Sequence, residues 1–120
     1  MIKSALPAII ALFVPIALAW FGLSRILGAH PYWEVQTIAI GAPIGLAAAF
    51  GMFFAGLNHK VTAITSIALL LGSMAGATYG KAVFVASYAD DRFAGQLWYF
   101  GWIAVGTFTA ATIFALLHRR

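Results

Sequence analysis

Four long apolar stretches, separated by short polar breaks, constrain this chain more than any other feature of its sequence. They run from Ser4 to Leu27, from Val35 to Leu57, from Val61 to Tyr88 and from Gln96 to Leu117. A helix needs about 20 mostly apolar residues to cross the hydrocarbon of a bilayer, and short connections join antiparallel neighbours in a bundle. The sequence therefore predicts an all-α integral membrane protein, one membrane domain over residues 1–120 with four antiparallel transmembrane helices.

Composition excludes the main soluble classes. Only 8% of the residues are charged and 63% are hydrophobic, whereas a soluble domain carries about 25% charged residues. So few charges cannot cover a water-soluble surface, which argues against a soluble globular domain, a disordered chain and a nucleic-acid-binding module. The chain has no cysteine, which excludes disulfides and thiolate metal sites. We predict no metal site, because the adjacent Asp90 and Asp91 lack the further oxygen ligands that calcium needs.

The placement of lysine and arginine predicts the orientation, because cytoplasmic loops carry the excess of these residues. In the four-helix arrangement, one side holds Lys3, Lys60, Arg119 and Arg120. The other side holds Arg25, Lys81 and Arg92 together with the acids Glu34, Asp90 and Asp91. We therefore expect both termini in the cytoplasm and the protein in a bacterial inner membrane.

Glycines at intervals of four residues mark a smooth face on the third stretch. Gly72, Gly76 and Gly80 share one side of a helix, and the second stretch carries a matching small surface at Gly41 and Gly45. Small residues let helix backbones approach closely in a membrane, so these positions predict tight helix packing. The partner helix can belong to this chain or to another subunit. The alternative is a smooth wall beside a quinone or a lipid tail.

Lys81 lies within the third stretch, where a charged group is costly unless it finds a partner or reaches the interface. Its long stem lets the ammonium group extend towards the membrane surface. Asp90, Asp91 or Glu34 could pair with it from the same side. The alternative is that Lys81 binds an anionic headgroup, a quinone or a translocated ion.

The first outer break concentrates polar groups within ten residues. Arg25, His30 and Glu34 could converge on an anionic ligand or exchange protons near neutral pH. Pro31 interrupts a helix at this point. The alternative is therefore a simple turn at the level of the lipid headgroups.

The same segment resembles the Arg-x-x-x-Ala-His-x-Asn-x-x-Glu element of the MAPEG family, which comprises small four-helix membrane enzymes that use glutathione. Arg25, Ala29 and His30 match that element, while Tyr32 replaces its Asn and Glu34 stands one position early. The resemblance is confined to this segment, and the family's longer basic first loop is absent.

No acidic residue lies inside the four stretches, which argues against proton-coupled exporters and intramembrane aspartyl chemistry. The leading hypothesis is therefore a non-catalytic accessory or assembly subunit of a larger membrane complex. The alternatives are a homo-oligomeric channel or small-solute transporter, and a small membrane enzyme that uses the first outer loop. We predict no cofactor, although a bound lipid or quinone fits the sequence. The expected partners are membrane lipids and other membrane subunits or further copies of the chain.

Overall fold

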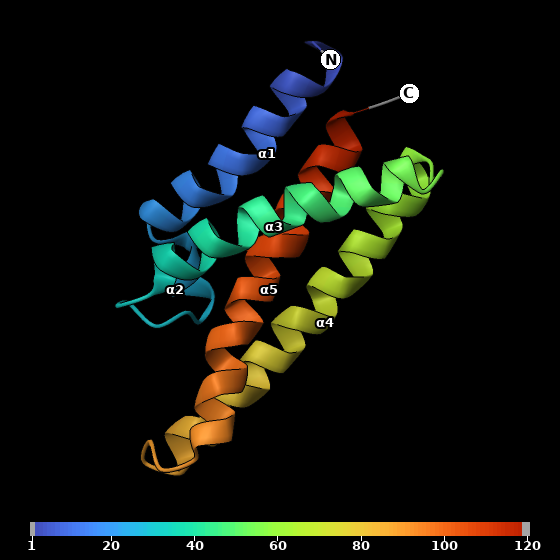
Figure 1. Ribbon diagram of the computed structural model, residues 1–120. Coiled ribbons are helices and arrows are strands. Elements are labelled where there is room, and N and C mark those ends of the chain that lie inside the picture. The colour runs from blue at the N-terminus through green and yellow to red at the C-terminus, as the bar shows by residue number, and fades with distance from the viewer. Residues whose placement is uncertain (1, 119–120) are drawn as a thin grey trace.

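The computed structural model describes residues 2–118 of the backbone and the side chains from residue 5 onward. This part of the chain is helical and contains no strand. The helices are α1 (Ile2–Trp20), α2 (Leu23–Leu27), α3 (Glu34–Phe54), α4 (His59–Ala86) and α5 (Arg92–Leu117). Figure 1 shows an elongated bundle, and its longest dimension is 49 Å.

The four longer helices alternate in direction along the molecule. The start of α1, the α3–α4 turn and the end of α5 lie towards one end, whereas α2 and the α4–α5 turn lie towards the other (Figure 1). Helix α5 is central, because it contacts α1, α3 and α4, while α3 and α4 touch each other little. Two hydrophobic clusters follow this arrangement, and α5 contributes to both, with Trp98 and Trp102 in one and Phe114 in the other.

The prediction of one continuous helix from Ser4 to Leu27 is wrong. Helix α1 ends at Trp20, and Gly22 has a left-handed φ of 96°. Glycine adopts this conformation at little cost because it has no Cβ. The amide of Gly22 donates to the carbonyl of Ala19 across 3.0 Å and closes the helix. The short helix α2 follows, so the chain changes direction before the first loop.

Three helices of the described chain are long and apolar enough to cross a membrane, namely α3, α4 and α5. Helix α1 is also apolar over the part whose side chains are described, from Ala5 to Trp20. The whole helix has 19 residues, which at 1.5 Å per residue is about 28 Å, close to the ~30 Å hydrocarbon core. The break at Gly22 ends α1 before the Leu27 boundary that the sequence predicts.

Side-chain caps define where α4 and α5 begin. The Asn58 side chain accepts a hydrogen bond from the amide of Val61 at 2.9 Å, and Asp91 accepts one from Ala94 at 3.0 Å. Such caps satisfy amide groups that have no partner within the helix. The turn between the helices bends at Tyr88 and Ala89, which both have positive φ.

Gly41 and Gly45 of α3 and Gly80 of α4 pack against α5, so the small faces of α3 and α4 do not face each other as a matched pair. A Cβ atom added at Gly41 would lie 2.8 Å from the backbone nitrogen of Thr107 in α5. A Cβ atom added at Gly45 would overlap the backbone of Thr107. On the other side, a Cβ at Gly80 would lie 2.7 Å from the backbone nitrogen of Trp98. Glycines therefore set the distance between α5 and each neighbour.

Candidate functional site

Trp98 organises the end of the molecule where the first loop, α4 and α5 meet. Its side chain is buried, with 7% exposed, and its indole Nε1 donates to the carbonyl oxygen of Gly28 at 2.9 Å. Gly28 ends α2 with a φ of 125°, a conformation suited to glycine. The bond ties the start of the loop to the first turns of α5.

Aromatic rings surround this tryptophan. The His30 ring lies 5.5 Å from that of Trp98 and 5.8 Å from that of Trp33, and the two indoles lie 5.1 Å apart at a steep angle. Tyr99 packs edge-on against Trp33 at 5.3 Å. These separations and angles are those that aromatic pairs favour. The loop is therefore a packed element of the fold in addition to a turn between helices.

The imidazole of His30 has a defined role in the loop. Its Nδ1 accepts a hydrogen bond from the backbone amide of Tyr32 at 3.1 Å. An imidazole nitrogen that accepts a hydrogen bond carries no proton, so the neutral ring holds its proton on Nε2.

Lys81 lies against Trp98 instead of pairing with an acid. Its Nζ is 5.8 Å from the centroid of the indole ring, within the range of a cation–π interaction. Within residues 5–118 no carboxylate lies within 4 Å of this ammonium group. The pairing with Asp90, Asp91 or Glu34 that the sequence suggested is therefore not present.

Glu34 pairs instead with Arg25, whose Nε lies 3.6 Å from the Glu34 Oε2. The Glu34 side chain is 14% exposed and that of Arg25 is 57% exposed. Glu34 is the first residue of α3, where a negative charge complements the helix dipole. The Glu34 Oε2 is buried and has no hydrogen bond from the described part of the chain. A half-exposed pair of this kind adds little stability, and it leaves the carboxylate incompletely satisfied.

The structure thus brings the four predicted ligand residues to one end in two groups. Lys81 and His30 both contact Trp98, while Arg25 and Glu34 pair with each other. Trp98 is not among the site residues predicted from the sequence. Its central position depends on contacts between distant parts of the chain, so its sequence context gave no specific signal.

The glycine series on α4 divides into two parts. Gly80 is buried against α5, but a Cβ added at Gly72 or Gly76 would have no atom within 4 Å. These two glycines line an open groove of about 420 Å³ between α4 and α5. Small side chains and a few larger apolar ones complete its walls, namely Ala68, Leu69, Ser73, Leu97, Phe100, Gly101 and Ala104.

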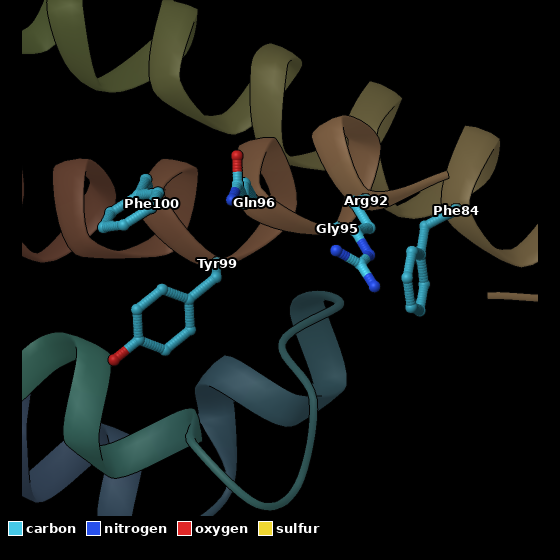
Figure 2. Close-up of a pocket in the computed structure, with 6 residues that line it drawn as sticks. All are labelled: Phe84, Arg92, Gly95, Gln96, Tyr99 and Phe100. Atoms are coloured by element: carbon cyan, nitrogen blue, oxygen red, sulfur yellow. The ribbon is translucent and has the colours of Figure 1, made fainter. Parts of the chain in front are cut away.

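A second hollow lies at the beginning of α5 (Figure 2). It has a volume of about 460 Å³ and is lined by Phe84, Arg92, Gly95, Gln96, Tyr99 and Phe100. The Arg92 guanidinium has no carboxylate within 4 Å among the described residues. Phe100 lines both this hollow and the groove on α4, so the two adjoin on the surface of α5.

The described residues hold no group of three or more histidine or acidic side chains placed to bind a metal ion. Comparisons with protein-family models, with curated proteins and with solved structures find no match for this chain. The residues gathered around Trp98 offer aromatic rings, the cations Lys81 and Arg25, and the partly satisfied carboxylate of Glu34.

Proposed function

We propose that this chain is a small integral membrane protein of a bacterial inner membrane, with both termini in the cytoplasm. It serves as a non-catalytic accessory subunit of a larger membrane complex. In this proposal α1 makes the fourth span beside α3, α4 and α5, because its 19 residues come close to the hydrocarbon thickness and local thinning of the bilayer accommodates the difference. The proposed partner contact is the open groove between α4 and α5.

Support for membrane insertion comes from the length and surface of the helices. Helix α4 has 28 residues, and large apolar side chains such as Ile64, Leu71 and Val85 are mostly exposed along it. Apolar patches of this extent are rare on soluble monomers and are typical of membrane or partner contacts.

The single observation that carries the subunit proposal is the contrast among the glycines. Gly41, Gly45 and Gly80 each hold a neighbouring backbone at close range, whereas Gly72 and Gly76 have open space above them. A membrane helix gains dispersion contacts when its backbone approaches such a surface. Helix α4 is also the least buried of the three long helices. Only 22% of the residues in its most apolar segment are buried, against 39% in α3 and 44% in α5.

The test is the native mass of the protein after gentle extraction from its own membranes. We expect stoichiometric partner proteins to accompany the 12.8 kDa chain. Replacing Gly72 and Gly76 together by Leu should fill the groove and release those partners. Gly51→Leu is the matched control, because Gly51 is also a helical glycine with no atom within 4 Å of an added Cβ.

Three results would contradict the proposal. A clean multiple of the chain mass would favour a homo-oligomeric channel, and flux through liposomes would then be the next assay. Equal release of partners by the groove variant and by Gly51→Leu would remove the groove as the contact. Loss of a turnover activity in His30→Ala would instead favour a membrane enzyme built on the first loop.

A further inference from the structure

The hollow at the beginning of α5 combines one cation with hydrogen-bond donors and aromatic walls. Arg92, Gln96 and Tyr99 supply the polar groups, and Phe84 and Phe100 flank them. Figure 2 shows these side chains around the first turns of α5, with the Arg92 guanidinium directed away from the helix axis. Figure 2 shows Phe84 beside Arg92 and Phe100 at the other end of the hollow, so aromatic rings border the polar groups on both sides.

The charge of Arg92 is not neutralised by its neighbours. Asp91, the adjacent acid, turns back to cap α5, where its Oδ1 accepts from the Ala94 amide at 3.0 Å. No carboxylate of the described residues lies within 4 Å of the guanidinium. The nearby Lys81 ammonium lies over the Trp98 ring. A ligand for this hollow should therefore bring its own negative charge.

The position of the hollow matches the boundary between headgroups and hydrocarbon. It lies next to the polar α4–α5 turn, and the Tyr99 ring in its wall packs against Trp33. Tyrosine and tryptophan are enriched at this level of a membrane. The adjoining groove, which shares Phe100, continues as apolar surface along α5. Arg92 to Ala104 covers about 18 Å of helix, similar to the length of an extended acyl chain.

We propose that this hollow binds the phosphate of an anionic phospholipid, whose acyl chain leaves past Phe100 along α5. Arginine suits this ligand, because its planar guanidinium donates two parallel hydrogen bonds to phosphate oxygens. Gln96 and Tyr99 also line the hollow, but their polar ends point away from the guanidinium in Figure 2, so Arg92 is the group that holds the phosphate. The inference rests on the proposed membrane location, and the lipid would lie at the edge of the proposed partner contact.

The experiment is native mass spectrometry of the isolated chain in mild detergent with equal amounts of phosphatidylglycerol and phosphatidylcholine of identical acyl chains. We expect a preference for phosphatidylglycerol in the wild-type protein. Arg92→Gln should lower that preference roughly fivefold, the effect of ~1 kcal/mol per cation at an anionic surface. Arg92→Glu should reverse it. Lys60→Gln is the control, because Lys60 is an exposed cation at the opposite end of α4.

The outcomes separate this site from the proposed function. Equal retention of the two lipids by the wild-type protein, or an equal loss in Arg92→Gln and Lys60→Gln, would overturn the phosphate site alone. Partner proteins would still be detected by native mass in that case. Recovery of the chain in the soluble fraction without either lipid would overturn both proposals.

Discussion

The indole Nε1 of Trp98 donates to the carbonyl oxygen of Gly28 across 2.9 Å, and 70 positions of sequence separate the two residues. This bond joins the first loop to the central helix and fixes the ring on which both His30 and Lys81 pack. The end of the molecule that carries the predicted ligand residues is therefore held by one long-range hydrogen bond.

Trp98→Phe should destabilise the fold more than Trp33→Phe. Both changes shrink an aromatic ring in the same cluster, but only Trp98 has an indole hydrogen bond within the described structure. Loss of that bond leaves the Gly28 carbonyl without its donor, which costs about 1 kcal/mol. Thermal unfolding in detergent micelles measures the difference, and equal effects of the two changes would contradict a structural role for the bond.

Lys81→Met should leave the fold as stable as the wild type or slightly more stable. The methionine side chain keeps most of the apolar packing of the lysine stem. In the proposed membrane location it removes an ammonium group, which costs ~2.5–3.5 kcal/mol at the centre of a membrane helix and less near its end, where Lys81 lies. The cation–π contact that is lost offsets this by ~0.5–2 kcal/mol. The unfolding midpoint in micelles gives the sign of the change. A clear loss of stability would mean that Lys81 has a stronger partner in the membrane than the Trp98 ring.

Gly45→Ala should be destabilising by ~1–3 kcal/mol, the usual cost of overpacking. A Cβ at this position would overlap the backbone of Thr107, which cannot move without shifting α5. Gly51→Ala on the same helix meets open space and should stabilise α3 by up to about 1 kcal/mol. Opposite shifts of the two variants in denaturant titration are the expected result. Similar shifts would show that α3 does not approach α5 through Gly45.

Thr62→Val should be neutral or stabilising by ~1 kcal/mol. Thr62 is fully buried, and its hydroxyl has no hydrogen-bond partner in the described part of the chain. A buried polar group without a partner carries a desolvation cost that the methyl group avoids. Thr112→Val is the control and should lose ~0.5–1 kcal/mol, because the Thr112 hydroxyl donates to the Phe108 carbonyl at 2.6 Å. A destabilised Thr62→Val would indicate that a water molecule or a partner subunit reaches this hydroxyl.

The sequence located the three long helices to within a few residues because length and polar breaks act locally. It began the last helix at Gln96, whereas α5 begins at Arg92, directly after the Asp91 cap, which satisfies the amide of Ala94. The break at Gly22 was missed because the apolar run continues on both sides of it. A glycine in an apolar stretch adopts either helical or left-handed φ, and the choice depends on where the following segment packs.

Apolar pattern alone determined that this chain forms long apolar helices joined by short polar breaks, because a chain with so few charges must hide its backbone groups in helices. Tertiary structure decided which small residues became contacts. Gly76 and Gly80 lie on one face of α4 at a spacing of four, yet α5 covers only Gly80, and the two helices diverge from their shared turn (Figure 1). The angle at which two helices cross depends on all the side chains packed between them, so no single glycine predicts which positions come into contact. The same packing placed Lys81 on Trp98 instead of an acid, while Glu34 at the start of α3 pairs with Arg25.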